Sequence, residues 1–315
     1  MFRSIVSSKA MSRIQANLVL LVAAAIWGST FVVQHVSMDI IGPMSFTSTR
    51  FFLGFLVVLP LAIREWQKKK MTLKEKTHEV IAKKDLGLMI VIGVILFTAT
   101  IIQQYGIIHT SVTNAGFLTA LYVPMVPLLG LIIFRKKPHW ITWIAIACSF
   151  SGTTLISGVD SSLQLGYGDA LILTSTIFWG LHVLLVGLVA ARTSMPLTLA
   201  AIQFAISAII AAAFAVAMET LTLEILKAAF WFIAYAGVLS VGIAFTLQVV
   251  GQAHTQPADA ALILSMETVF AAVAGAVILG ERLEMTSMIG CALILSAILM
   301  VEVLPILIRK RRRFS

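Results

Sequence analysis

Long apolar runs separated by short polar segments dominate the sequence. An apolar α-helix of about 20 residues is long enough to cross a bilayer, and runs of that length follow one another along the whole chain. Because most of the connecting segments are short, consecutive helices are expected to pack as antiparallel neighbours. We therefore predict an all-α membrane protein with ten transmembrane helices, at 16–36, 43–63, 86–105, 112–134, 140–158, 169–190, 196–217, 228–250, 258–279 and 286–306.

The fourth and ninth predicted helices have related sequences. The segment 106–130 (GIIHTSVTNAGFLTALYVPMVPLLG) aligns with 251–275 at an offset of 145, and Trp27-Gly28 aligns with Trp179-Gly180 at an offset of 152. Each unit then holds five helices, and an odd number turns the second unit upside down in the membrane. We predict two inverted five-helix repeats, 1–158 and 159–315, around a central cavity, as in many secondary transporters.

The composition agrees with a membrane protein, and the distribution of charge predicts its orientation. Hydrophobic residues make up 59% of the chain, charged residues 12%, and the net charge is +9. With ten helices, 20 of the 23 lysine and arginine residues fall on the side of the two termini. This bias predicts that both termini are cytoplasmic, and it accounts for the net charge without a nucleic-acid partner. Cys148 and Cys291 lie in apolar runs, which argues against a disulfide framework or a metal cluster.

Glu267 is the leading candidate for function because it lies near the middle of an apolar helix. A carboxylate is costly there unless it is protonated, paired or hydrated, and at offset 145 its counterpart is the uncharged Tyr122. Its candidate roles are binding an amino group and carrying a proton, or else a purely structural bond to a neighbouring helix. Arg50 could bind a substrate carboxylate; snorkelling to the interface and pairing with an acid are equally open.

Aromatic and polar side chains within the predicted helices are the remaining candidates. Aromatic rings can enclose an organic ligand or a cation, although packing between helices is their commoner use. Imidazole and amide groups in a membrane helix need polar partners, which a substrate could supply. These candidate residues are Trp27, Phe31, Gln103, Tyr105, Tyr122, Phe178, Trp179, His182 and Gln248.

The sequence carries little sign of catalysis. Gly166-Tyr167-Gly168-Asp169 fits the G-x-G-D pattern of intramembrane aspartyl proteases, but Asp259, the other candidate aspartate, falls at the opposite membrane face. Asp169 is instead expected to cap the sixth helix. Zinc-protease, serine-hydrolase and phosphate-binding-loop motifs are missing, so we expect neither an enzyme nor a bound cofactor or metal.

Several segments resemble the drug/metabolite transporter superfamily, EamA type. They are METVFAAVAGAVILGERLEMTSMIGCALILSAILM (266–300), AAIWGSTFVV (24–33), the Arg50-Phe51 pair and GDALILTSTIFWG (168–180). The resemblance implies ten helices, cytoplasmic termini and a cavity lined mainly by helices 1, 3, 4, 6, 8 and 9, with helices 5 and 10 at the periphery. Family members often have proline after the acidic position of helix 9, where this chain has Thr268. A weaker kink is expected there than in helix 4, which contains Pro124 and Pro127.

These observations favour a secondary transporter of small organic metabolites such as amino acids, working as an exporter by alternating access. Alternatives are an importer or exchanger of a cationic, S-adenosylmethionine-like metabolite, a drug-efflux protein and, more remotely, a membrane enzyme or scaffold. The expected partners are a small-molecule substrate, the lipid bilayer and protons as a candidate coupling ion. The expected location is the cytoplasmic (inner) membrane of a bacterium.

The ten-helix topology predicts opposite locations for two connecting segments. A cysteine introduced at Lys70 should react with a membrane-impermeant reagent from the cytoplasmic side, and one at Asp160 from the outer side. Reaction of both positions from the same side would overturn the ten-helix topology.

Overall fold

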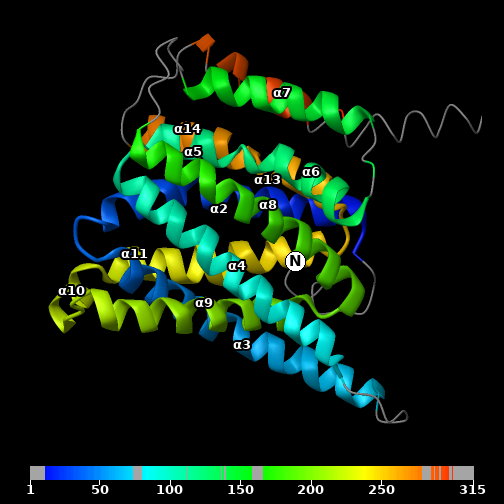
Figure 1. Cartoon of the computed structure of the whole chain (residues 1–315), viewed down its shortest axis with the longest axis vertical. Coiled ribbons are helices and arrows are strands. Elements are labelled where there is room, and N and C mark those ends of the chain that lie inside the picture. Colours follow the sequence, from blue (N-terminus) through cyan, green and yellow to red (C-terminus); the bar gives the residue numbers. More distant parts are fainter. Residues whose placement is uncertain are drawn as a thin grey trace, which may run out of the picture.

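The computed structural model is a bundle of helices packed side by side (Figure 1). It describes residues 11–73, 80–110, 112–135, 137, 140–157, 166–278, 285–286, 288–290, 292–297 and 300. These residues contain no β-strand. Their elements are α2 (Arg13–Ser37), α3 (Pro43–Leu73), α4 (Lys83–Ile108), α5 (Val112–Thr119), α6 (Tyr122–Phe134), α7 (Trp140–Ser157), α8 (Tyr167–Thr193), α9 (Pro196–Met218), α10 (Leu223–Ala228), α11 (Phe230–Ala234), the π-helical segment η1 (Tyr235–Phe245), α12 (Thr246–Gln252), α13 (Pro257–Leu264) and α14 (Met266–Ile278).

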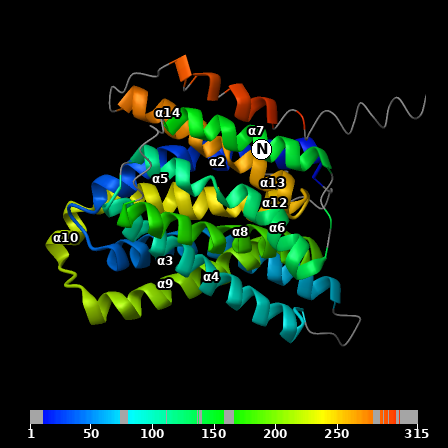
Figure 2. The ribbon, with the colours of Figure 1, turned by 45° about the horizontal axis from the view of Figure 1, so that its top comes forward.

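Six helical stretches of the described chain are long and apolar enough to cross a membrane. They are α2, Pro43–Thr72 of α3, α4, α8, α9 and the continuous stretch Phe230–Gln252. The predicted fourth and ninth helices are each divided in two, into α5 and α6 and into α13 and α14. The predicted fifth helix is α7, which lies at the edge of the bundle, far from α3 and α9 (Figures 1 and 2). The described residues cover only part of the predicted tenth helix, 286–306, since 287, 291, 298, 299 and 301–306 lie outside them.

The helices begin at residues that suit a helix start. Ser12 caps α2 through its hydroxyl, which accepts from the backbone N–H of Gln15, and the Gln15 side chain accepts from the Ser12 N–H in return. Such a capping box satisfies two backbone donors that a helix start leaves unpaired. Pro196 and Pro257 occupy the first positions of α9 and α13, where a missing N–H costs nothing. Asp169 lies at the third position of α8 rather than at the predicted capping position, which Gly166 occupies, and Asp169 Oδ2 accepts from the Gly166 N–H at 3.1 Å.

Helices α3 and α9 cap each other's first turns. The carboxylate of Glu219, just after α9, accepts from the N–H groups of Met44 and Ser45 at the start of α3, both at 2.8 Å. At the other end of the pair, Glu65 of α3 accepts from the N–H groups of Leu197 and Thr198 at 3.2 and 2.7 Å. A carboxylate at a helix N-terminus satisfies unpaired donors and interacts favourably with the helix dipole. The two caps therefore hold both ends of an antiparallel pair that joins the two halves of the chain.

Ion pairs tie further helices together at the end of the bundle where α2 begins. Arg13 Nη2 of α2 lies 2.8 Å from Asp259 Oδ2 of α13. Arg192, in the last turn of α8, pairs with Asp85, in the first turn of α4. Asp259 and Asp85 each lie in the first turn of a helix, where negative charge is favourable. The helix ends are thus fixed by polar contacts, whereas the long middle sections pack through apolar side chains.

Loss of either carboxylate cap should destabilise the fold. Glu65→Gln and Glu219→Gln each leave a single carbonyl oxygen where two oxygens accepted backbone N–H groups, so the free energy of unfolding should fall by about 1–2 kcal/mol. Asp39→Asn is the matched control, because Asp39 is exposed and its side chain makes no hydrogen bond or ion pair with the described residues. The measurement is the thermal unfolding midpoint in detergent. Equal midpoints for all three variants would contradict the capping role.

Candidate functional site

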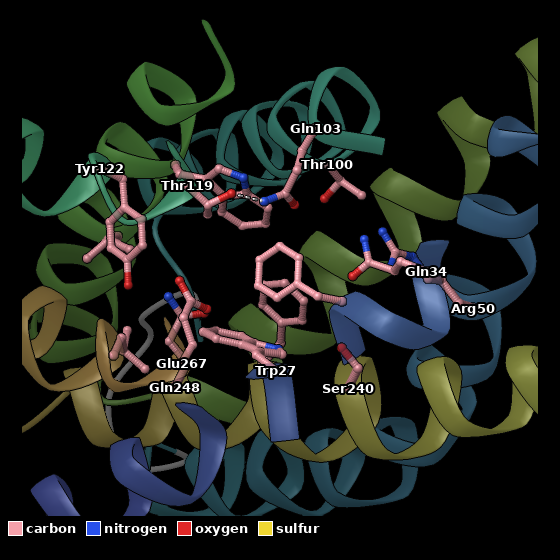
Figure 3. Close-up of a pocket in the computed structure, with 15 residues that line it drawn as sticks. Trp27, Gln34, Arg50, Thr100, Gln103, Thr119, Tyr122, Ser240, Gln248 and Glu267 are labelled. Carbon is pink, nitrogen blue, oxygen red and sulfur yellow. Dashed lines mark hydrogen bonds between the residues drawn. The ribbon is translucent and has the colours of Figure 1, made fainter. Parts of the chain in front are cut away.

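A small polar cavity lies inside the bundle, between side chains from both halves of the chain (Figure 3). Its volume of about 50 Å³ holds a few water molecules but is too small for an organic metabolite, so a substrate would need the walls to move apart. The lining comes from α2, α3, α4, α5, α6, α8, η1, α12, α13 and α14. The lining residues are Trp27, Phe31, Gln34, Arg50, Thr100, Gln103, Thr119, Tyr122, Trp179, Val183, Ser240, Phe245, Gln248, Leu264 and Glu267.

The two divided helices meet this cavity at equivalent positions. Helix α5 ends at Thr119 and α13 ends at Leu264, 145 residues later, which is the offset of the sequence repeat. Tyr122 then begins α6, and Glu267 lies in the first turn of α14. Backbone that leaves the regular helix within a membrane occurs where it lines a cavity, and all four of these residues line this one. The ninth helix divides at Ser265, although no proline follows Glu267. This interruption spans one residue, whereas the one between Thr119 and Tyr122 spans two.

Glu267 occupies one side of the cavity. Its side chain is buried, with 4% of the residue exposed, and Oε1 has no hydrogen-bond partner in the described part of the chain. Figure 3 shows the Tyr122 hydroxyl pointing toward the Glu267 carboxyl group, with Gln248 beside it. The Tyr122 hydroxyl is likewise buried without a partner. This side of the cavity therefore offers a carboxyl, a phenol and an amide to a bound molecule.

Arg50 occupies the opposite side, together with Gln34 (Figure 3). Its guanidinium carbon lies 5.1 Å from the centre of the Phe46 ring and 5.5 Å from that of Phe51, within the range of cation–π attraction. Only 4% of the residue is exposed, and Nε has no hydrogen-bond partner among the described residues. Arg50 therefore neither snorkels to the interface nor pairs with a described acid.

Three aromatic rings form one wall between these two sides. The Phe245 ring lies 4.6 Å from that of Trp27 and 5.9 Å from that of Trp179, to which it is nearly parallel. Phe245 also contacts the rings of Phe51 and Phe204, so the wall continues into the main apolar core. Because Phe245 ends η1, the wider turns of the π-helix help to set its position.

Unpartnered polar groups are concentrated at the cavity. In the described part of the chain, 14 buried side-chain nitrogen or oxygen atoms have no hydrogen-bond partner. Seven of them belong to lining residues: Trp27, Arg50, Thr100, Tyr122, Trp179, Gln248 and Glu267. Buried polar groups in native proteins are nearly always bonded to protein or water. A polar occupant, water or ligand, therefore belongs in this cavity.

Eight of the eleven residues predicted from the sequence line the cavity. Among them Gln103, the counterpart of Gln248 in the repeat, donates from Nε2 to Thr119 Oγ1 at 2.8 Å. The amides of Gln103 and Gln248 thus lie on the same cavity from different halves. The eight residues are Trp27, Phe31, Arg50, Gln103, Tyr122, Trp179, Gln248 and Glu267.

Tyr105, Phe178 and His182 lie outside the lining. Tyr105 packs against an apolar cluster of α4 and α9, and Phe178 is half-buried away from the cavity. His182 is fully buried behind the aromatic wall, where Nε2 lies 2.9 Å from Gln203 Oε1 and the ring contacts Trp179 edge-on. A neighbouring helix thus offsets part of the desolvation cost of this imidazole, whose Nδ1 has no partner among the described residues.

Seven further residues line the cavity, and helical spacing relates some of them to the predicted ones. Thr100 precedes Gln103 by three positions, and Phe245 precedes Gln248 by three, so each pair shares a helical face. Gln34 lies seven positions after Trp27. The remaining residues, Thr119, Val183, Ser240 and Leu264, have common side chains in apolar runs, and their sequence carries no signal of a cavity.

The class of protein follows from a family match: the chain is a membrane transporter. Two stretches, 14–158 and 166–303, match the model of the EamA-like transporter family. The chain belongs to this family and is an integral membrane protein. Within the described residues no group of three or more histidine, cysteine or acidic side chains could hold a metal ion.

Relatives of similar length carry the names of transporters. An uncharacterized transporter of Archaeoglobus fulgidus is 30% identical over 295 residues, which is 94% of this chain and 88% of the relative. The uncharacterized transporter YwfM of Bacillus subtilis is 24% identical over 294 residues, 92% and 94% of the two chains. A crystal structure of a protein with 16% identity superposes with a TM-score of 0.74, over 93% of this chain and 98% of that one. This structural similarity shows a shared fold alone.

The close approach of α2 to α14 at Gly28 should be essential for the site. A Cβ atom at Gly28 would lie 2.6 Å from Phe270 Cβ and 2.8 Å from the Glu267 carbonyl oxygen, so Gly28→Ala must push α14 away from α2. We expect a loss of about 1–3 kcal/mol of stability, read as a lower thermal unfolding midpoint. Gly87→Ala is the control, because a Cβ at Gly87 meets nothing within 4 Å. Equal midpoints for the two variants would show that the helices are not tightly packed at Gly28.

Proposed function

We propose that the protein is a secondary transporter that exports small organic metabolites such as amino acids across the cytoplasmic membrane. The observation that carries the proposal is the central cavity, where seven lining residues from both halves keep polar atoms without partners. Glu267 lies about 15 Å from either end of the α13–α14 segment, at 1.5 Å per residue. A polar site near mid-depth is where a transporter binds its substrate.

Alternating access between two inverted five-helix repeats, 1–158 and 159–315, is the proposed mechanism. The equivalent divisions at Thr119 and Leu264 support it. The reciprocal caps support it too. Glu219 accepts from the N–H groups of Met44 and Ser45, and Glu65 accepts from those of Leu197 and Thr198, which lie 153 positions after Met44 and Ser45. Related halves in opposite orientations can exchange an inward-open and an outward-open shape at similar energy. In this proposal the small cavity belongs to a state between the two.

The charges on the cavity favour a zwitterionic substrate. Glu267 can bind an ammonium group and Arg50 a carboxylate, on opposite sides of the cavity (Figure 3). The wall of Trp27, Phe245 and Trp179 would contact the apolar part of such a molecule. A cationic metabolite or drug is the second candidate, favoured by Glu267 beside tryptophan rings. Arg50 on the same cavity disfavours a substrate that carries positive charge alone.

The proposed orientation places both termini in the cytoplasm, and Glu267 is the proposed site for a coupling proton. The basic residues support the orientation, because Arg13, Lys69, Lys84 and Arg192 lie at the end of the bundle where α2 begins. Positive charge is enriched on the cytoplasmic side of membrane proteins. Glu267 supports proton coupling because a carboxyl group without a partner can hold either a proton or an ammonium ion.

Substitution of the two charged cavity residues tests the proposal. In proteoliposomes loaded with amino acids, Glu267→Gln and Arg50→Gln should each lower flux about tenfold or more. The free energy of one hydrogen bond to a charged group corresponds to a change of this size. Glutamine cannot exchange a proton, so Glu267→Gln should also flatten the dependence of flux on pH. Asp39→Asn, which changes an exposed acid outside the cavity lining, is the control.

Two results would contradict the proposal. Absence of flux for a wide pool of metabolites, combined with a measured catalytic turnover, would replace the transporter with an enzyme. Wild-type flux of Glu267→Gln at every pH would remove Glu267 from the site. Comparison of excreted metabolites in cells with and without the protein tests the direction of transport separately.

A further inference from the structure

A second cavity lies at the end of the bundle where α2 begins, beside the last turns of α3. Its volume is about 270 Å³, far larger than that of the central cavity. One wall is a stripe of α3 with helical spacing, and the other is the junction between α8 and α9. The lining residues are Leu61, Arg64, Glu65, Lys68, Lys69, Thr72, Ser194 and Leu197.

The charges in this cavity are not balanced. Glu65 is engaged by the start of α9, where its oxygens accept from two backbone N–H groups and from Thr198 Oγ1. Lys69 lies four residues after Glu65 and donates to the Thr193 carbonyl oxygen at 3.5 Å. The side chains of Arg64 and Lys68, also four residues apart, have no hydrogen-bond or ion-pair partner in the part of the chain that is described. Like charges at this spacing repel each other, and a bound anion would remove the repulsion.

The cavity lies at the depth of the lipid headgroups. With 31 residues, α3 is about 46 Å long, whereas the hydrocarbon core is about 30 Å thick. The last turns of α3 therefore extend beyond the hydrocarbon. Trp66, 39% exposed, marks the level of the interface where tryptophan is enriched, and Ile63, 46% exposed, lies just before it. Leu61 and Leu197 give the cavity an apolar edge on the hydrocarbon side.

We propose that this basic pocket binds the phosphate headgroup of an anionic phospholipid such as phosphatidylglycerol. Arg64 and Lys68 would pair with the phosphate oxygens, and the exposed Ser194 is a further donor to the headgroup. The apolar edge would contact the start of the acyl chains, which a free phosphate lacks. Basic pockets between membrane helices on the cytoplasmic side are suited to such headgroups.

Lipid binding to the purified full-length protein tests this site. Native mass spectrometry should detect phosphatidylglycerol bound in preference to phosphatidylcholine. Each charge near an anionic headgroup contributes about 1 kcal/mol, so Lys68→Gln should weaken binding about fivefold and Arg64→Gln/Lys68→Gln about thirtyfold. The matched control Lys70→Gln/Lys84→Gln removes the same charge from the same end of the bundle, outside the pocket, and should leave the affinity within about twofold.

Three results would overturn the proposal. The first is an equal loss of binding in the control, which means that surface charge alone attracts the lipid. The second is displacement of the lipid by millimolar inorganic phosphate, which means a site for a free anion. The third is full retention of binding in both Lys68→Gln and the pocket double variant. Because these side chains lie outside the central cavity, transport by the variants reports that they are folded.

Discussion

The structure depends on one constraint: inside a bilayer, backbone N–H and C=O groups must find partners within the chain. Most of the described chain meets this constraint with long helices. It departs from regular helix between Thr119 and Tyr122, at Ser265 and along η1, and each of these places contributes side chains to the central cavity. The cavity is therefore formed where the helices are interrupted, and the interruption near Glu267 brings its carboxyl group and the Tyr122 hydroxyl to the same side.

Charged groups at several helix ends have partners, whereas the charged groups at the centre keep atoms without one. Glu219 and Glu65 cap α3 and α9, and Arg13 pairs with Asp259. At the centre, the carboxyl group of Glu267 and the guanidinium of Arg50 keep atoms without partners. A helix bundle fixed at its ends can contain polar groups without partners at its centre. The many buried apolar contacts and the contacts at the helix ends offset the free energy lost by burying those polar groups. That cost is recovered when water or a substrate fills the cavity.

Much of this fold and site could be predicted from the sequence because charge within an apolar run is a strong physical signal. That signal identified Glu267 and Arg50, and the repeat identified Gln103 with Gln248. Features that depend on neighbours distant in sequence could not be predicted. Phe245 has the sequence context of any core phenylalanine, the partner of His182 is Gln203 on another helix, and the division at Ser265 has no proline to signal it. The caps by Glu65 and Glu219 likewise depend on how α3 and α9 pair.

The central claim is that the cavity between Glu267 and Arg50 is the transport site. A cysteine at Ser240, a small lining residue, tests it directly in a chain whose Cys148 and Cys291 are replaced by alanine. The measurement is the alkylation rate of that cysteine by a small impermeant reagent added to either face of oriented vesicles. We predict reaction from both faces, slowed by the transported amino acid. Reaction from neither face, or a rate that no transported compound changes, would contradict the account.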